Sequence, residues 1–526
     1  MKNIYNLKRY AIYVLSMFVT ILWTGCENTV LNLEPVDNFY DTNAFSSPER
    51  CELAVIGAYD AAQCGLYSNG TRTRGYPFGA ASIILSEMRG EDMNLTQTFY
   101  NPVYSSTINL STGNIVSMWE TSFEAINRYN VVIQGIEEAG KAGVITNELK
   151  EQYLGECYFL RALTYHNLMV HFAYPYNIEG NNNYGLPVYL TPTTSPDQIE
   201  EHLNIGRSSV KDTYTQILTD LENAEHMLPE TIGESPISRA SKGAAIALKT
   251  RVYLHERNWG KVIEEAVKLK EGIYSLEPDP ATPFISFSSN KESIFSIANS
   301  ATDNGGVNGA MSAMFNAHTG GRAMCPTSPI LYNSKFWRED DKRRNLLYYR
   351  ESDKYYWCDK YTHGGVYDEW APIIRYAEVL LNQAEAEARL EHKTEALALL
   401  NEVRNRSLDD YENKEYKEED FNSIQELVEA ILWERRIEFH GEGRRWEDIH
   451  RLAADDLCPT GGIPAKIEYS KATGKGAFVI GGELDPDWLP EALQAVPYTD
   501  RRFLWPIPQN DLIRNPKLAE QQNLDW

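Results

Sequence analysis

Two glutamates four residues apart are the strongest candidates for acid–base chemistry in this chain. Glu434 and Glu438 share one face of a predicted helix, and two carboxyl groups could act as the acid and the nucleophile of a glycosidase. The arginines that surround them in the sequence are Arg435, Arg436, Arg444, Arg445 and Arg451. A carboxylate beside arginine stays ionised with a lowered pKa, which disfavours it as a general acid near neutral pH. We therefore interpret this Arg/Glu block as a structural ion network that ties the last helix pair together.

Other catalytic motifs are missing from the sequence. His255-Glu256 continues without the second histidine of an HExxH zinc site. The chain has no GxSxG elbow, no P-loop and no GxGxxG after a predicted strand. Its ten histidines do not cluster as metal ligands, and single histidines on helices, such as His166 and His171, are more often packed or solvated. We therefore expect a binding protein with no catalytic residue, no metal and no cofactor.

Long loops rich in aromatic and amide residues indicate a different chemistry, the binding of sugars. Aromatic faces stack on the C–H surfaces of sugar rings, while amides and cations pair with hydroxyl groups. Residues 66–110 and 275–371 have this composition, and loops of such length in a compact protein are usually functional. The candidate ligand-binding residues within them are Arg72, Tyr76, Tyr100, Asn101, Tyr104, Phe315, His318, Arg322 and Trp357. For each single aromatic residue, burial in the core is the more frequent alternative.

Helices must position these loops. Apolar residues recur at steps of three or four along much of the chain, as in Ile115, Trp119, Phe123, Ile126 and Tyr129. Helices are predicted for residues 45–62, 112–139, 148–172, 208–228, 239–256, 259–271, 372–390, 393–406, 423–440 and 444–452. The pattern predicts a mainly α fold.

Two helical pairs, residues 242–273 and 376–407, resemble each other. Each has alanines in its first helix, then a short turn and an amphipathic return helix. Alanines let paired helices approach closely, and a two-helix unit of about 34 residues is the tetratricopeptide pattern. Such units stack because one pair alone cannot cover its apolar face. Two ordinary helical hairpins are the alternative.

The first residues have the pattern of a secretory signal. Basic residues precede an apolar run over 10–23, and the small residues Thr24 and Gly25 lead to Cys26. A cysteine at this place is typical of a bacterial lipoprotein signal, although Trp23 departs from its strictest form. The alternatives are an ordinary cleaved signal and an uncleaved helix, but the run is shorter than the ~20 residues that cross a bilayer. We expect acylation of Cys26 and membrane contact only through the lipid anchor.

Composition argues against several partners. Without the three basic residues of the predicted signal, 47 basic residues face 74 acidic residues, a net charge of −27. Such a field disfavours nucleic acid and anionic membrane surfaces. The six cysteines after Cys26 show no CxxC pair and could form disulfides after export, with a connectivity that the sequence does not assign.

Ordered sequence blocks along nearly the whole chain resemble one family. The most specific block is ERRIEF at 434–439 with GEGRRWEDIHR at 441–451, which is similar to a late signature of the SusD/RagB family. Further blocks that resemble the family, in the same order, are 161–165, 185–188, 214–229, 241–254, 375–381, 400–404, 503–508 and 515–516. The Arg/Glu block resembles a fold signature of the family, and ligand sites in the family vary in position, so no ligand residue is carried over.

The resemblance implies a surface-exposed outer-membrane lipoprotein with tetratricopeptide-like helix pairs and a SusC-like TonB-dependent outer-membrane barrel as its partner. It implies the capture of oligosaccharide or polysaccharide for nutrient uptake. Capture of peptides or other oligomers is the alternative within the family. A surface glycoside hydrolase and a protein-only adaptor are the alternatives outside it.

The expected organisation follows from these patterns. We expect a signal at 1–25, a lipidated extended tether at 26–44 and a single SusD-like domain over 45–526. Within that domain the helical scaffold is predicted for residues 45–65, 112–173, 207–273 and 372–452. A loop-rich lobe with short strands is predicted for 66–111 and 274–371, followed by a C-terminal segment at 453–526.

Overall fold

The computed structural model describes residues 43–526 except 66–74, 179–182, 234–236 and 271. The predicted signal, Cys26 and almost all of the predicted tether lie outside the described residues, and so does Arg72. Among the helices that are described, none is long and apolar enough to span a membrane.

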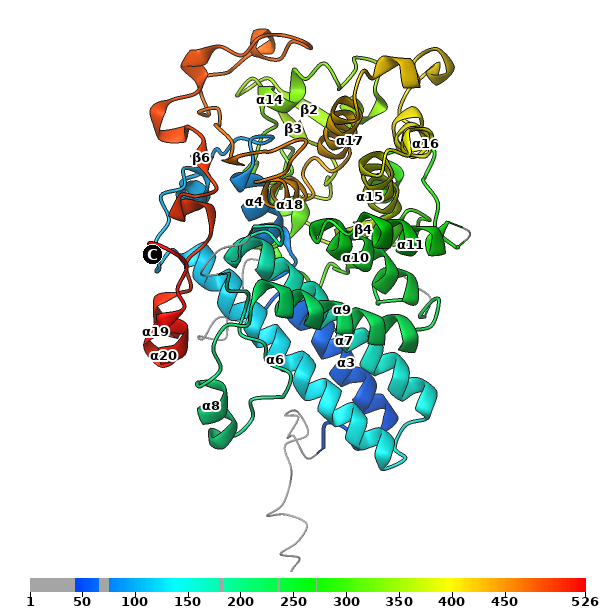
Figure 1. The fold of residues 1–526 in the computed structure, drawn as a ribbon, viewed down its shortest axis with the longest axis vertical. Helices are drawn as coiled ribbons and strands as arrows, with labels where there is room; N and C mark the ends of the chain where they lie inside the picture. The colour runs from blue at the N-terminus through cyan, green and yellow to red at the C-terminus, as the bar shows by residue number, and fades with distance from the viewer. Residues whose placement is uncertain (1–42, 66–74, 179–182, 234–236, 271) are drawn as a thin grey trace, which may run out of the picture.

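Four long helices lie side by side in one half of the molecule (Figure 1). They are α3 (Pro48–Gln63), α6 (Gly113–Lys141), α7 (Asn147–Phe172) and α9 (Val210–Met227). α6 packs on α3 and α7, and α7 packs on α9. Serine and threonine side chains cap several of these helices; Thr146, for example, accepts a hydrogen bond from the Leu149 amide at the start of α7. The predicted mainly α fold is confirmed.

The two similar helical pairs continue this stack. They are α10 (Lys242–His255) with α11 (Trp259–Leu269), and α15 (Tyr376–Arg389) with α16 (Lys393–Asn405). α10 and α11 both contact α15, and α10 also contacts α9 (Figure 1). Gly243 to His255 are all buried, because α10 lies between these neighbours. Ala244 and Ala245 are fully buried, as expected of small residues where helices approach closely.

Helix α4 (Ala80–Arg89) differs from the sequence prediction, which placed it in a loop-rich lobe. Each of its ten residues is buried, and it contacts α18 (Arg445–Arg451). The prediction followed the composition of residues 66–110 as a whole, which is rich in Gly, Asn, Thr and aromatic residues, and this short helix lies inside that stretch. Part of residues 66–111 is therefore core.

Strands are few and short. In the described residues they form three two-stranded antiparallel sheets. The pairs are β1 (Ser293–Ile297) with β4 (Ala371–Arg375), β2 (Leu347–Arg350) with β3 (Tyr355–Cys358), and β5 (Gly462–Ile463) with β6 (Val496–Pro497). In the β2–β3 hairpin Tyr348 is opposite Trp357, so both side chains point to the same face.

Shorter helices and one further long helix complete the chain. The long one, α17 (Ile424–Glu438), packs on α15 and carries the first part of the Arg/Glu block. The short helices are α5 (Asn101–Tyr104), α8 (Pro196–His202), α12 (Thr282–Ile285), α13 (Met311–Met314), α14 (Pro329–Tyr332), α19 (Gln509–Arg514) and α20 (Pro516–Glu520). The cysteines Cys51, Cys157, Cys325, Cys358 and Cys458 are free thiols.

Candidate functional site

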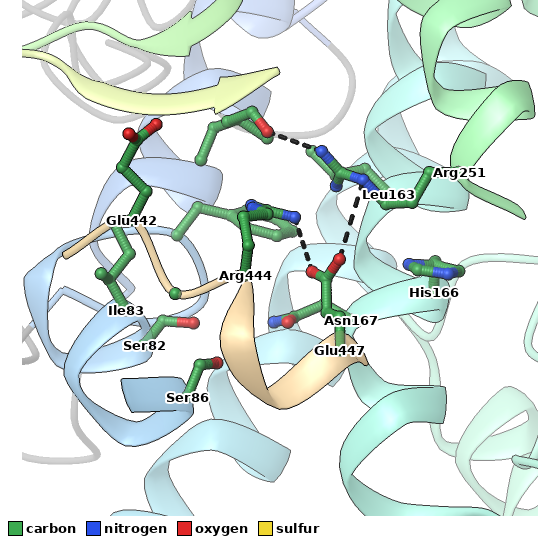
Figure 2. Close-up of a pocket in the computed structure, with 13 residues that line it drawn as sticks. Ser82, Ile83, Ser86, Leu163, His166, Asn167, Arg251, Glu442, Arg444 and Glu447 are labelled. Carbon is green, nitrogen blue, oxygen red and sulfur yellow. Dashed lines mark hydrogen bonds and ion pairs between the residues drawn. The ribbon is translucent and has the colours of Figure 1, made fainter. Parts of the chain in front are cut away.

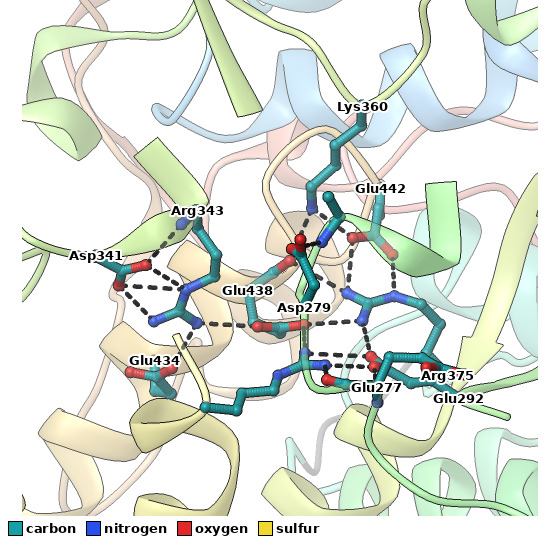
Figure 3. A network of polar contacts seen from close by, with 12 residues as sticks. Glu277, Asp279, Glu292, Asp341, Arg343, Lys360, Arg375, Glu434, Glu438 and Glu442 are labelled. Carbon is teal, nitrogen blue, oxygen red and sulfur yellow. Dashed lines mark hydrogen bonds and ion pairs between the residues drawn. The ribbon is translucent and has the colours of Figure 1, made fainter. Parts of the chain in front are cut away.

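The glutamates of the Arg/Glu block lie in a buried ion network (Figure 3). Arg343 Nη1 donates hydrogen bonds to Glu434 at 2.5 Å and to Glu438 at 2.9 Å. Glu438 also accepts from Arg375 at 2.8 Å and from Arg406 at 2.6 Å. The side chains of these five residues are at most 7% exposed, so a sugar cannot reach the carboxylates.

The partners in this network differ from those that the sequence suggests. The two glutamates pair with arginines that are distant in the sequence, whereas the arginines of the block pair with other acids. These pairs are Arg435 with Asp448, Arg436 with Asp92, Arg444 with Glu447, Arg445 with Glu91, and Arg451 with Glu385. Neighbouring helical residues point to different faces, so sequence proximity did not identify the counter-ions.

The pKa values of the two glutamates shift in opposite directions. The guanidinium groups of Arg406, Arg375 and Arg343 overcome the effect of burial and hold the pKa of Glu438 well below its usual range. Burial raises the pKa of Glu434, whose main cation Arg343 is shared with two other acids. The sequence prediction of a lowered pKa is therefore wrong for Glu434. Both carboxyl groups lack access to a substrate.

An open cleft of about 530 Å³ adjoins this network at the surface. Segments far apart in the sequence line it with Asp279, Ala281, Phe284, Ile285, Lys342, Asn345, Leu346, Asp359, Lys360, Thr362, His363 and Asp409. The buried ring of Phe284 lies 4.7 Å from Lys360 Nζ and 5.4 Å from Arg375 Cζ. Because Lys360 Nζ also bonds Glu442 at 2.6 Å, the network supports this wall of the cleft (Figure 3).

Apolar groups are exposed at one side of the cleft. Ile285, the last residue of α12, is 73% exposed. The ring of Phe287, two residues further on, lies 5.8 Å from His363 and 6.2 Å from Trp370. His363 Nδ1 is in turn 3.0 Å from an Asp368 carboxylate oxygen, which fixes the ring orientation. This side of the cleft offers flat or apolar surface to a ligand.

Asp359, which lines the cleft and directly follows β3, connects the cleft to the β2–β3 hairpin. His318 Nε2 lies 2.8 Å from Asp359 Oδ1, and the His318 ring is 4.0 Å from the Tyr348 ring. His318 is 40% exposed and Asp359 is 25% exposed, so both remain accessible. The carboxylate is thereby oriented beside an aromatic pair. Such a combination suits a sugar, which presents an apolar ring face and a rim of hydroxyl groups.

The structure corrects five of the predicted ligand-binding residues. Tyr76, Tyr100, Tyr104, Phe315 and Trp357 are at most 4% exposed, so they present no ring face to solvent. Their rings pack in the core; Tyr104 donates its hydroxyl hydrogen to the Ile467 carbonyl at 2.7 Å.

The remaining described candidates, Asn101, His318 and Arg322, are exposed. Of these three, His318 contacts a cleft residue, while Arg322 bonds Asn308. Sequence reasoning missed Ile285, Asn345, Asp359 and Thr362, which come from short helical turns and loops too brief to show a periodic pattern. Ile285 lies between Phe284 and Ser286, and no local pattern in the sequence marks it as exposed.

A second, much smaller cavity is too small for a sugar (Figure 2). Its volume is about 30 Å³, and it lies between α4, α7, α10 and the start of α18. Glu447 accepts from Arg444 at 2.6 Å and lies 3.8 Å from Arg251, so its charge is matched. Burial holds the pKa of the adjacent His166 well below its usual range. We interpret this cavity as a polar part of the core.

No metal cluster accompanies either cavity in the part of the chain that the structure describes: no three His, Cys, Asp or Glu side chains there are placed to hold an ion.

Comparisons with known proteins agree with this architecture. A family model described as the SusD family matches residues 341–526, and one described as starch-binding associating with outer membrane matches 55–254. SusD-like protein P38 of Formosa agariphila is 24% identical to the chain, with 100% of both chains covered. A SusD superfamily protein of Bacteroides fragilis is 27% identical with a TM-score of 0.72, covering 90% of this chain and 99% of its own. Surface glycan-binding protein A of Bacteroides uniformis has a TM-score of 0.66 at 21% identity, covering 91% and 99%.

Proposed function

Since the chain belongs to the SusD family, we propose that it captures glycans at the cell surface and passes them to a SusC-like TonB-dependent outer-membrane barrel. In this proposal the cleft between Ile285 and the His318–Tyr348 pair holds the oligosaccharide. The protein is anchored by lipid at Cys26. The family description that mentions starch binding and the outer membrane supports both the ligand class and the location.

The observation that carries the proposal is the mixture of surfaces in the cleft. Ile285 supplies apolar contact, with the Tyr348 ring next to the cleft through His318, and Asp359, Asn345 and Thr362 supply acceptors and donors for hydroxyl groups. Pockets for small ligands typically combine apolar walls with a few placed polar groups in a volume of about 300–1,000 Å³. The described cleft, at about 530 Å³, lies in this range.

We further propose that capture occurs without turnover. A glycosidase needs two accessible carboxyl groups, one of them protonated. Glu434 and Glu438 are buried in ion pairs. Of the carboxylates that line the cleft, Asp359 is bonded to His318, Asp409 to Lys342, and Asp279 accepts from the Ala281 amide. Weak binding in the range of about 1 μM to 1 mM suits a protein that must release its ligand to a transporter.

Isothermal titration calorimetry of the purified protein against panels of oligosaccharides and peptides tests this proposal. Ile285→Ala and His318→Ala should each weaken oligosaccharide binding by about tenfold, since each removes contact area at one side of the cleft. Ile513→Ala is the matched control, because Ile513 is 71% exposed on α19 and does not line the cleft. Its affinity should equal that of the unaltered protein.

Three results would contradict the proposal in distinct ways. Full affinity in both cleft variants would remove the cleft as the site. Binding of peptides alone would favour peptide capture. New reducing ends in the same samples would show a hydrolase.

A further inference from the structure

A second hollow of about 550 Å³ adjoins the cleft. Lys342 and Asp409 line both spaces, and their charged groups are 3.2 Å apart. Backbone pairing fixes this bridge, because the Lys342 amide donates to the Ser407 carbonyl at 2.8 Å. The two side chains are 39% and 78% exposed, so the bridge lies at the surface between the cleft and the hollow.

The second hollow has groups suited to a sugar. Tyr411 is 46% exposed and lines the hollow, so its ring is available for stacking. Arg406 also lines the hollow, although its side chain is only 7% exposed. Its Nη atoms bond Glu292 and Glu438, but its buried Nε–H has no acceptor among the described residues. A buried donor without an acceptor is unfavourable, and a ligand hydroxyl would satisfy it.

The charged residues that line either the cleft or the second hollow are mostly acidic. The acids are Asp279, Asp359, Glu402, Asp409 and Asp410. The cations Lys360 and Arg406 are already matched by Glu292, Glu438 and Glu442 in the buried network. Lys342 alone among the lining lysines and arginines is outside that network, and it pairs with Asp409. A glycan that carries carboxylate or sulfate groups would therefore meet like charge.

We infer that the ligand is an uncharged oligosaccharide that crosses the Lys342–Asp409 bridge and occupies both the cleft and the second hollow. This inference rests on the proposed function and adds the charge class and the extended length of its ligand. A short oligosaccharide fills the cleft alone, and a longer one gains the contacts of Tyr411 and Arg406.

Length dependence tests the second hollow. Calorimetry would compare hexaoses with trioses of the malto, xylo and manno series, on the unaltered protein and on Tyr411→Ala. For the series that binds, Tyr411→Ala should weaken hexaose binding by about tenfold. The same substitution should change the affinity for the triose of that series by less than about twofold. Tyr411→Phe retains the ring and should restore hexaose affinity. Equal losses for both lengths, or no loss for either, would overturn the extended site.

Charge dependence is tested with a hexamer of galacturonate at low ionic strength. It should bind at least about tenfold more weakly than the best neutral hexaose. Equal or tighter binding of the galacturonate would overturn the charge assignment. Absence of binding by all of these oligosaccharides would overturn the proposed function together with the inference. Sensitivity to Ile285→Ala with none to Tyr411→Ala would retain the proposed function and reject only the second hollow.

Discussion

The buried ion network and the surface cleft use the same residue types for opposite purposes. Glu438 is 2% exposed and bonds three guanidinium groups, whereas Asp359 is 25% exposed and bonds one imidazole. A carboxylate that is removed from water must find its partners within the protein, because the loss of hydration is costly. An exposed carboxylate retains lone pairs for a ligand. Burial and completeness of pairing, not residue type, therefore separate the structural carboxylates from the carboxylate proposed to bind ligand.

The two regions are also mechanically connected. Phe284 lines the cleft and contacts Lys360 and Arg375 of the network. The network joins α17 to segments near β1, β3 and β4, and these segments lead into the loops that line the cleft. The network therefore supports the walls of the cleft, and two of its members, Lys360 and Arg406, line the cleft and the second hollow themselves.

The largest expected effect is a loss of stability when a glutamate of the buried ion network is replaced. Glu438→Gln should lower the free energy of unfolding by ~3–5 kcal/mol, because it leaves three buried guanidinium groups undercompensated. Urea denaturation measures this change, and Glu419→Gln at an exposed position is the control. The folded fraction should bind oligosaccharide with unchanged affinity. Unchanged stability with lost turnover would instead support a catalytic role.

Trp357 in the β2–β3 hairpin and His318 beside this hairpin sharpen the comparison between buried and exposed rings. Trp357→Ala should destabilise the protein by ~3–5 kcal/mol, because the indole is fully buried. His318→Ala should change stability by less than ~0.5 kcal/mol, because its ring is at the surface. Thermal unfolding of both variants measures the difference. A stable Trp357→Ala protein with weakened binding would restore Trp357 as a ligand residue.

A smaller effect is expected from pH. Burial, with the nearby charge of Lys360, lowers the pKa of His440 to about 3 from an ordinary value of 6.5. Between these values the unfolded chain binds one proton more than the folded chain, so stability falls as the pH decreases from about 6.5 to 3. At ~1.4 kcal/mol per pH unit, this residue contributes a loss of about 2 kcal/mol by pH 5.

Urea denaturation of His440→Gln at pH 7 and pH 5 isolates this contribution. The loss of stability between the two values should be smaller than in the unaltered protein by about 2 kcal/mol. An equal loss in both proteins would show that His440 does not titrate as its burial implies.

Loss of the proposed lipid anchor should have the smallest effect on the stability of the ion network and on binding in the cleft. Cys26→Ala should move the protein from membrane to soluble fractions, because acylation needs the thiol. Cys26 precedes the described domain, so stability and oligosaccharide affinity should remain unchanged. Equal membrane retention of the variant would contradict the lipoprotein assignment.

Local periodicity determined much of the fold from sequence alone. The predicted segments 112–139, 148–172 and 393–406 correspond to α6, α7 and α16 within a few residues. Amphipathic helices can be recognised in a sequence from their apolar periodicity, because one face is buried and the other is solvated. Helix α4 was missed because the loop-like composition of residues 66–110 as a whole, rather than local periodicity, decided the prediction there.

Ordered motifs also identified the family, but the site depended on tertiary structure. Sequence alone predicted that the Arg/Glu block is ionic, and only the fold revealed that Arg343, Arg375 and Arg406 are the partners of its glutamates. Exposure likewise belongs to the folded chain: Trp357 and Tyr348 face the same side of one hairpin, yet only Tyr348 remains accessible beside the cleft. Contacts between distant segments decide burial, and no local pattern in the sequence records them.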